Sequence, residues 1–426
     1  MNNATHFNRR DFIKLAAASG IMQLSPQGFA MATKLPLGRV VVIGGGYAGA
    51  TVAKYLRLWG LGSIEVIVVE PNSQFISCPL SNLVLGGSKS INDLTFSYDA
   101  LIANHGIKWV RDTVTAIDPT AKKVTMLRGE ISYDRLIVAP GVDFNYDSLP
   151  AMANVDAQQM IPHAWKAGWQ TVNLRKQLEA MPDGGVFVMN VPKAPYRCPP
   201  GPYERACQVA GYFKSRKPKS KVIVLDANAE IICKKGLFAK VFTETYAGIV
   251  DYKPDSAIAS IDVAAKTVST DFDKVKADVL NIIPPQRAGK IAQIAGLTEK
   301  DYPWCDVNFL SYESMLVPNI HVLGDSVAAG LPKSAHMATN QAKVCANAIV
   351  QLLSGQAPDP APVFANTCYS FVNDKLAMHV ANVYRYEEGK KMMVSAEGGG
   401  VSMSPNEKEG VYALAWAQNI WADTLT

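Results

Sequence analysis

Two short apolar runs near the start of the chain lie on either side of a stretch that predicts a helix. Residues 39–43 and 64–69 consist mainly of Val and Ile, which is typical of parallel strands buried on both faces. Residues 50–59, between them, predict the helix. The order strand, helix, strand therefore predicts the first unit of a parallel α/β fold.

Later apolar runs extend this pattern. Residues 185–189 and 319–323 predict further strands, and residues 341–353 predict another helix. Residues 354–362 (SGQAPDPAP) are rich in proline, which is excluded from the interior of helices and strands. We therefore expect a domain boundary in this segment. No run beyond the N-terminal region is long and apolar enough to predict a transmembrane helix.

The turn after the first predicted strand contains a G-x-G-x-x-G motif. Gly44 permits the tight turn, Gly46 lets the backbone approach a pyrophosphate, and Gly49 allows close packing of the following helix. The second predicted strand ends at Glu70, 21 residues after Gly49, where a carboxylate accepts a hydrogen bond from a ribose hydroxyl. These features predict a dinucleotide site. The contacts expected from the turn are Gly44, Gly46, Tyr47, Ala48 and Gly49.

Two later segments favour a flavin over a nicotinamide as the bound cofactor. Residues 133–141 (YDRLIVAPG) resemble the mid-chain turn of flavoproteins with two dinucleotide-binding domains, and residues 319–326 (NIHVLGDS) resemble their C-terminal strand. The aspartate of that strand, here Asp325, contacts the ribityl-phosphate region of FAD in the superfamily. Each segment alone could be an ordinary strand end, but with the glycine turn they predict FAD. The contacts expected here are Ala139, Gly141, Gly324 and Asp325.

The second glycine motif that such enzymes use for a nicotinamide cofactor is missing. The predicted strand at 185–189 runs into residues 190–195 (NVPKAP), which contain no glycine. Pro192 and Pro195 remove backbone amides that a phosphate would need. We expect the second domain to keep its fold without binding NAD(P)H.

The first 32 residues resemble a twin-arginine export signal. Residues 9–14 (RRDFIK) form a basic head, residues 13–24 are apolar but too short to cross a bilayer, and residues 30–32 (AMA) form a small-x-small cleavage site. The alternative is a disordered amphipathic N-terminus. Export by this pathway predicts a periplasmic protein that folds around its cofactor before it crosses the membrane.

Charge and composition exclude several other classes of function. The formal net charge of +5 is mild, which argues against a nucleic acid partner. The six histidines form no cluster with metal-ligand spacing, so we expect no metal site. We expect His336 either to support a neighbouring site residue or to serve in packing. No C-x-x-C-H motif occurs, so the chain carries no c-type haem.

Three of the seven cysteines lie where they could carry chemistry. Cys198 lies in a proline-rich loop where a second cofactor would otherwise bind, Cys78 follows Glu70 by a short loop, and Cys368 follows the proline segment. None of these forms a C-x-x-C or C-x-x-x-x-C pair, so disulfide reductases of the glutathione-reductase type do not fit. Cys207 and Cys345 are expected on buried helices. Cys233 and Cys305 are either loop thiols or a pair.

At these residues the chain resembles the flavoprotein subunit of flavocytochrome c sulfide dehydrogenase, which is related to sulfide:quinone oxidoreductases. The resemblance spans the whole chain. It is carried by the twin-arginine leader and by residues 78–82 (CPLSN), 198–206 (CPPGPYERA) and 331–336 (LPKSAH).

The resemblance implies a role for each of these residues. Cys78 is expected to bind FAD covalently through the 8α-methyl group as a thioether. Cys198 and Cys368 are expected to form a redox-active disulfide beside the flavin, and Glu204 to act as an acid or base near it. A hydrosulfide ion can attack such a disulfide, which makes the assignment chemically sensible. Further expected FAD contacts are Val114, Lys333 and Ser334.

Simpler interpretations remain open for the same residues. Cys78 could be buried beside a non-covalent flavin. Cys198 and Cys368 could form a purely structural disulfide. Glu204 could be a solvated residue at a helix start, where a negative charge favours the helix dipole.

The sequence thus predicts an α/β fold with two Rossmann-like, glutathione-reductase-like domains and a small α+β C-terminal domain. The resemblance implies that the last domain contributes to the interface with a separate cytochrome c subunit, which carries haem c and forms a heterodimer with this chain. The tail is rich in aromatic residues, which suits a partner surface, a flavin cover or a small sheet with its own core. The expected boundaries are 1–32 for the leader, 33–150 and 276–356 for the FAD-binding domain, 151–275 for the second domain, and 357–426 for the C-terminal domain.

The leading hypothesis is a periplasmic sulfide dehydrogenase that passes electrons to cytochrome c. A sulfide:quinone oxidoreductase at the membrane surface is the second hypothesis, although Glu407, Lys408 and Glu409 argue against an apolar C-terminal anchor. The third is a non-catalytic flavin-binding partner protein. The presence of all three named cysteines argues against it.

Overall fold

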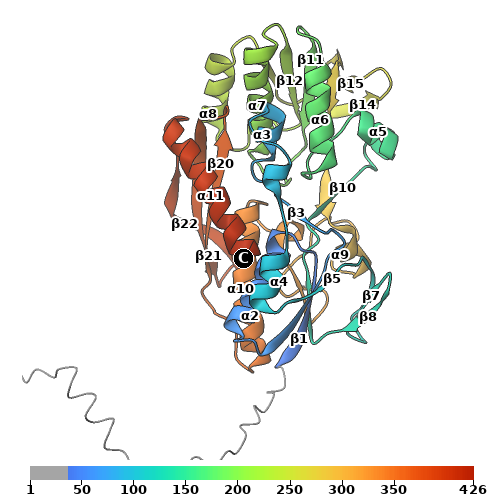
Figure 1. Cartoon of the computed structure of the whole chain (residues 1–426), viewed down its shortest axis with the longest axis vertical. Coiled ribbons are helices and arrows are strands. Elements are labelled where there is room, and N and C mark those ends of the chain that lie inside the picture. Colours follow the sequence, from blue (N-terminus) through green and yellow to red (C-terminus); the bar gives the residue numbers. More distant parts are fainter. Residues whose placement is uncertain (1–36) are drawn as a thin grey trace, which may run out of the picture. The chain divides into compact units, whose positions relative to one another are not determined.

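The Val- and Ile-rich runs form the centre of a five-stranded parallel sheet (Figure 1). In the computed structural model, which describes residues 37–426, β1 (Gly38–Ile43) pairs with β2 (Ile64–Val69) and β9 (Arg135–Val138). The edge strands are β5 (Lys108–Val110) and β19 (Ile320–Val322). Helices α2 (Tyr47–Trp59) and α10 (Ala335–Leu353) pack against each other beside this sheet. The expected leader at 1–32 lies outside the described residues.

The order β19-β9-β1-β2-β5 joins segments that are far apart in the sequence. Strand β19 follows the whole second domain in the sequence, so the first α/β domain is discontinuous. The predicted helix at 50–59 begins earlier than expected, at Tyr47, because the glycine turn itself forms the helix start. The domain boundaries expected at 150, 275 and 356 stay a prediction, since residues 36–426 cluster as one compact unit.

A second parallel sheet forms the other α/β domain. Its strand order is β13-β12-β11-β17, with β11 (Val186–Val191) and β12 (Lys221–Asp226) in the middle. β13 (Val250–Lys253) and β17 (Val279–Asn281) are the edges. The strand predicted at 185–189 is therefore confirmed as β11. Helices α6 (Trp169–Ala180) and α7 (Gly201–Arg216) belong to this domain, and α7 follows the proline loop after β11.

The chain after the proline segment forms a three-stranded antiparallel sheet and one long helix. The strands are β20 (Val363–Phe371), β21 (Ala377–Glu387) and β22 (Met392–Val401), and the helix is α11 (Glu407–Leu425). The end of α11 contacts α2: Tyr55 on α2 donates a hydrogen bond to Asp423 on α11 at 2.6 Å. The expectation of two Rossmann-like domains plus a small α+β domain is thus confirmed.

Short elements connect these layers. The small sheets comprise β3 (Phe75–Ile76) with β4 (Thr95–Phe96), β6 (Val114–Asp118) with β7 (Lys123–Met126) and β8 (Gly129–Ser132), β10 (Val142–Phe144) with β18 (Gln286–Ala288), and β14 (Ile258–Asp262) with β15 (Thr267–Thr270) and β16 (Lys274–Lys276). The short helices are α3 (Ser81–Gly86), α4 (Asp99–His105), α5 (Val155–Met160), α8 (Lys235–Lys240) and α9 (Lys290–Ile294), with helical turns η1 (Asn92–Leu94), η2 (Pro150–Met152), η3 (Val241–Thr245) and η4 (Gly324–Ser326).

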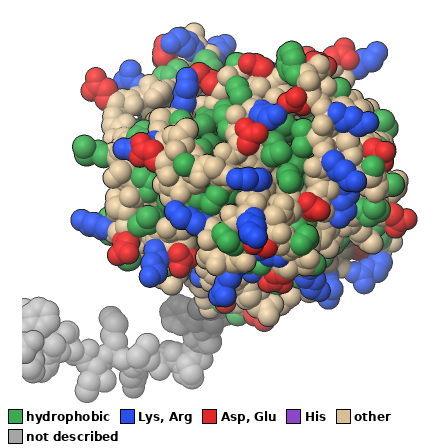
Figure 2. Space-filling view, turned by 90° about the horizontal axis from the view of Figure 1, so that it is seen from above, with side chains coloured by type: hydrophobic (Ala, Val, Ile, Leu, Met, Phe, Trp, Pro, Cys, Tyr) green, Lys and Arg blue, Asp and Glu red, His purple; other side chains and the backbone are tan. Residues whose placement is uncertain are grey.

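Two surface properties bear on partners. Among residues 37–426, none of the helices combines the length and the apolar character needed to cross a membrane. Figure 2 shows that basic and acidic side chains are interspersed on the face it presents, with apolar side chains between them. That face therefore lacks the single-sign basic stripe that nucleic acid binding requires.

Candidate flavin and thiol site

A cavity of about 610 Å³ brings together segments from all three parts of the fold. It is lined by the glycine turn before α2, the loop that contains Cys78, the proline loop after β11, and the start of α10. Strand β20 and helix α11 also contribute. The predicted site residues that line it are Gly44, Gly46, Tyr47, Ala48, Glu70, Cys78, Ala139, Gly141, Cys198, Glu204, Gly324, Asp325, Ser334 and Cys368.

Three predicted FAD contacts lie elsewhere. Gly49 packs α2 against the sheet, because a Cβ there would lie 1.8 Å from the carbonyl oxygen of Gly44. Val114 begins the peripheral strand β6. Lys333 is buried behind the cavity wall, where its ammonium donates hydrogen bonds to the carbonyls of Asp325 and Val327 and lies 3.7 Å from the Trp304 ring centre. Lys333 therefore supports the Asp325 turn from behind.

The glycine turn has the shape of a phosphate cradle. Gly44 has φ +98°, and a Cβ there would lie 2.5 Å from the carbonyl oxygen of Ala139. No atom lies within 4 Å of the position that a Cβ of Gly46 would take, so the backbone there opens onto free space. Glu70 accepts a hydrogen bond from the Gly45 amide at 2.7 Å, which fixes the carboxylate at the cavity edge.

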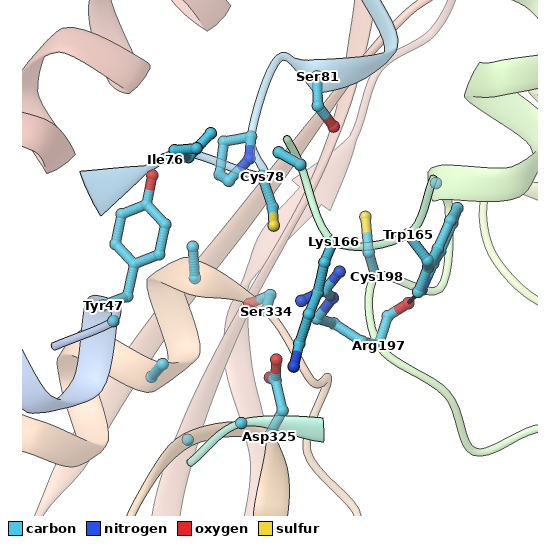
Figure 3. Close-up of a pocket in the computed structure, with 18 of the residues that line it drawn as sticks. Tyr47, Ile76, Cys78, Ser81, Trp165, Lys166, Arg197, Cys198, Asp325 and Ser334 are labelled. Carbon is cyan, nitrogen blue, oxygen red and sulfur yellow. Dashed lines mark hydrogen bonds between the residues drawn. The ribbon is translucent and has the colours of Figure 1, made fainter. Parts of the chain in front are cut away.

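Asp325 provides a second observation that fits a flavin. Its Oδ1 atom is buried and has no hydrogen-bond partner among residues 37–426. Burial raises the pKa of this carboxyl, while the charges of Arg197 and Lys333 lower it. A buried carboxylate oxygen without a partner is costly, and Figure 3 shows the side chain pointing into the cavity. Hydroxyl groups of a ribityl chain would satisfy it, so the residues present fit FAD.

All three predicted reactive cysteines reach this cavity. Figure 3 shows the sulfurs of Cys78 and Cys198 directed into it from two different loops, and Cys368 lines it from β20. Each is a free thiol in the structure. Cys198 has a left-handed backbone with φ +59°, and Asn366 donates a hydrogen bond to the Cys368 sulfur at 3.4 Å. The structure thus places Cys198 and Cys368 in one cavity, and their disulfide stays a prediction.

Glu204 lies in the first turn of α7 beside these thiols. Its Oε1 atom accepts a hydrogen bond from the Phe371 amide at 2.8 Å, and its Oε2 atom accepts one from Asn82 at 2.9 Å. Burial raises the pKa of this carboxyl, and the two hydrogen bonds and the charge of Lys234 lower it. A solvated residue at a helix start would have neither the burial nor these partners.

Arg205, the next residue, was missed by the sequence interpretation. Its side chain is buried and donates hydrogen bonds to Asn82, to Asn281, and to the carbonyls of His163 and Ala164, at 2.7–3.2 Å. A single guanidinium thereby joins α3, α7, β17 and the loop after α5. The only signal in the sequence was its place in the segment 198–206.

Two further cations enter the cavity. Figure 3 shows Arg197 and Lys166 extending between the cysteine sulfurs and Asp325. Neither stood out in the sequence, although Arg197 directly precedes Cys198. His336 also lines the cavity; it accepts a hydrogen bond from the Thr367 amide at 3.0 Å and lies near Trp416. No potential metal-binding cluster occurs among residues 37–426.

The remaining cysteines are also accounted for. Cys207 and Cys345 are buried on α7 and α10, as predicted. Cys233 and Cys305 are free thiols in the structure.

In the second α/β domain, the acidic residue at the ribose-binding position forms hydrogen bonds with other residues of the chain. Asp226, at the end of β12, occupies the position where a Rossmann fold binds the ribose of its nucleotide. It accepts hydrogen bonds from the hydroxyls of Tyr203 and Tyr252, at 2.8 and 2.9 Å, and from the amide and side chain of Asn228. The buried carboxylate is therefore saturated by the chain itself, which supports the expectation that this domain binds no NAD(P)H.

Comparison with protein families agrees with this architecture. Residues 171–284 match the central domain of the sulfide dehydrogenase [flavocytochrome c] flavoprotein chain, and residues 360–425 match the flavin-binding domain of flavocytochrome c sulphide dehydrogenase. Residues 38–167 match the pyridine nucleotide-disulphide oxidoreductase family. The sulfide dehydrogenase [flavocytochrome c] flavoprotein chain of Chlorobaculum thiosulfatiphilum is 56% identical over 46 residues, which are 11% of this chain and 94% of that sequence.

The chain belongs to this flavoprotein family. The family is related to the sulfide:quinone oxidoreductases. The mitochondrial sulfide:quinone oxidoreductase of Mus musculus is 23% identical over 336 residues, covering 75% of this chain and 72% of that protein. The crystal structure of the sulfide:quinone oxidoreductase from Aquifex aeolicus superposes with a TM-score of 0.71 at 18% identity, covering 91% of each chain. This last similarity shows the shared fold.

The Arg205 network generates a testable prediction on stability. In the variant Arg205→Met, four buried acceptors lose their donor, so we expect the free energy of unfolding to fall by about 3 kcal/mol. Urea unfolding followed by tryptophan fluorescence measures this change. Arg216→Met, on the exposed end of the same helix, is the control and should leave the unfolding midpoint unchanged. Equal effects of the two substitutions would contradict the role of Arg205.

Proposed function

We propose that this protein is an FAD-dependent sulfide dehydrogenase that uses a disulfide between Cys198 and Cys368 and delivers electrons to a cytochrome c subunit. The observation that carries the proposal is the shared cavity, in which these two thiols meet the dinucleotide-type turn of Gly44 and Gly46. The family membership supports the same conclusion, because the Chlorobaculum relative is by name a sulfide dehydrogenase flavoprotein chain.

The disulfide provides an electrophile for a soft nucleophile. A hydrosulfide ion attacks one sulfur of the pair, the sulfur–sulfur bond breaks, the attacked cysteine becomes a persulfide, and the other leaves as a thiolate. Re-forming the disulfide releases the added sulfur at the oxidation level of elemental sulfur, with one proton and two electrons. FAD, when bound, is the two-electron acceptor, and the residues that would hold it are those of the glycine turn, Glu70, Asp325 and Ser334.

The chain supplies a proton acceptor next to this reaction. Glu204 is the carboxyl closest in sequence to Cys198, and burial raises its pKa above the usual range for glutamate. A carboxyl with a raised pKa is a stronger base than a solvated one. The hydrogen bonds from Phe371 and Asn82 hold its two oxygens in place.

The proposal also includes a covalent link between Cys78 and FAD and a periplasmic location. The Cys78 sulfur points into the same cavity as Cys198, as a covalent link to FAD through its 8α-methyl group would require. Such a link suits an exported enzyme, which cannot readily replace a lost cofactor. The twin-arginine pattern in residues 1–32 supports a periplasmic location.

A quinone acceptor is the second candidate. Two relatives that cover 75% and 72% of this chain, from Mus musculus and Dictyostelium discoideum, are named sulfide:quinone oxidoreductases. The third hypothesis, a non-catalytic flavin-binding partner, is disfavoured because three cysteines and Glu204 all face the cavity.

The decisive experiment supplies sulfide to the purified flavin-loaded protein with either cytochrome c or decylubiquinone as acceptor. We expect sulfide-dependent reduction of cytochrome c, and the variant Cys198→Ser should lose it because no disulfide can form. Cys305→Ala is the control, since this buried thiol lies outside the cavity lining. Preferred turnover with decylubiquinone would establish the quinone alternative, and no turnover with either acceptor would favour the non-catalytic one. NADH should not replace sulfide as donor.

The covalent link to FAD is tested by acid denaturation. We expect the yellow colour to stay with the wild-type polypeptide in the precipitate and to move into the supernatant for Cys78→Ala, because that variant has no sulfur to form the thioether. Cys345→Ala, which removes a buried thiol on α10, should retain the colour. A flavin that is extractable from the wild type, or retained by Cys78→Ala, would contradict the assignment.

The role of Glu204 predicts a particular pH dependence. Its carboxylate form increases as pH rises through a pKa that burial has raised, so flavin reduction per hydrosulfide ion should accelerate over that range. In Glu204→Gln we expect the rate of flavin reduction no longer to rise with pH over this range. Its plateau value at high pH should fall about 100-fold. Stopped-flow measurements over a pH series check this. Glu179→Gln, at an exposed ion pair with Arg175, is the control, and an unchanged profile in Glu204→Gln would exclude the role.

A further inference from the structure

A buried lysine lies beside the cysteine pair and has no role in the reaction described so far. Lys234 is 9% exposed, and its ammonium donates hydrogen bonds to the carbonyl oxygen of Cys368 at 3.0 Å and to the Ser370 hydroxyl at 2.8 Å. Cys368 and Ser370 are two residues apart on β20, so their side chains share one face of the strand. The ammonium therefore binds the strand segment that carries the reactive thiol.

The backbone at Lys234 is unusual. Its φ of +54° is in the left-handed region, immediately before α8. A side chain with a Cβ is strained there, and such positions persist only when the surroundings hold them in place. Burial of a lysine is also costly unless its charge is compensated. Two unfavourable features thus coincide at a residue whose ammonium is bound to β20 by two hydrogen bonds.

The positive charge of Lys234 affects the pKa of the Cys368 thiol. Burial raises the pKa of the Cys368 thiol, and the charge of Lys234 lowers it, as do hydrogen bonds from Asn366 and Ser334. Burial lowers the pKa of Lys234, while Cys233, Cys368, Glu204 and Cys198 raise it. The titratable groups that face Cys368 are Lys234 and Cys233 from the loop before α8, Cys198 and Glu204 from the proline loop and α7, Tyr384 from β21, and His336 from α10.

We propose that Lys234 is a positioning residue for the cysteine pair: it holds the 368–370 segment of β20 and provides the counter-charge for an anion on the Cys368 sulfur. This inference rests on the proposed function. If the hydrosulfide attacks the Cys198 sulfur, Cys368 leaves as a thiolate. If it attacks the Cys368 sulfur, Cys368 becomes a persulfide, which is negatively charged once its proton passes to a base such as Glu204. An ammonium near that sulfur lowers the energy of either product without forming a bond to it.

The experiment measures the acidity of Cys368 directly. In a Cys198→Ser background, which leaves Cys368 without its partner, the rate of Cys368 alkylation by iodoacetamide is followed over a pH series by peptide mass spectrometry. Lys234→Met should raise the midpoint of the pH profile by about one pH unit and slow alkylation at neutral pH about tenfold. Lys234→Arg keeps the charge and should keep the midpoint. Because alkylation needs no sulfide, the result is independent of the proposed activity.

Two controls separate electrostatics from folding. Lys235→Met removes the neighbouring exposed lysine, which pairs with Glu230, and should leave the profile unchanged. Lys234→Gln keeps a hydrogen-bond donor but no charge, and it replaces the Met variant if that variant does not fold. An alkylation midpoint that is the same with lysine, methionine and glutamine at position 234 would overturn the proposal, even if the variants unfold more easily.

Discussion

The site depends on the buried polar network at the first turn of α7. Glu204 and Arg205 are adjacent, and both bond to Asn82, which follows the Cys78 loop. Glu204 reaches further to β20, and Arg205 reaches to β17. Because buried charged groups are costly without partners, this network tolerates little movement of any of the four segments. It thereby holds three distant cysteines around one cavity.

The cavity is lined by charged side chains of both signs. The basic ones are Lys166, Arg197 and Arg205, and the acidic ones are Glu70, Glu204 and Asp325. Burial lowers the pKa of Lys333, which lies behind the wall, to about 8. Basic side chains in a confined, partly desolvated space attract anions. Both a dinucleotide and a hydrosulfide ion carry negative charge, so the same field serves the cofactor and the proposed substrate.

Sequence reasoning succeeded where the signal is local. The strand and glycine turn at 39–49, Glu70 and the Gly324-Asp325 turn each depend on residues within one βα unit, and the structure places them as expected. It missed Arg205, Asn82 and Lys234, because their importance depends on contacts with segments about 40 to 140 positions away, which no periodicity reveals. The three cysteines stood out by their positions in the chain, but their individual roles came only from the family resemblance. Val114 was assigned by the same route, but it lies outside the cavity lining.

The second α/β domain shows how a nucleotide-binding architecture can place a thiol at the edge of a cavity. In parallel α/β sheets, ligands bind beyond the carboxyl ends of the strands. Here the loop after β11 carries Cys198 and leads into Glu204, and the loop after β12 carries Lys234. Asp226, which would otherwise bind a ribose, is saturated by two tyrosines and an asparagine. The carboxyl ends of the strands thus still carry loops with charged and polar groups. Those groups now face a pair of sulfur atoms, because strand β20 brings Cys368 to this edge.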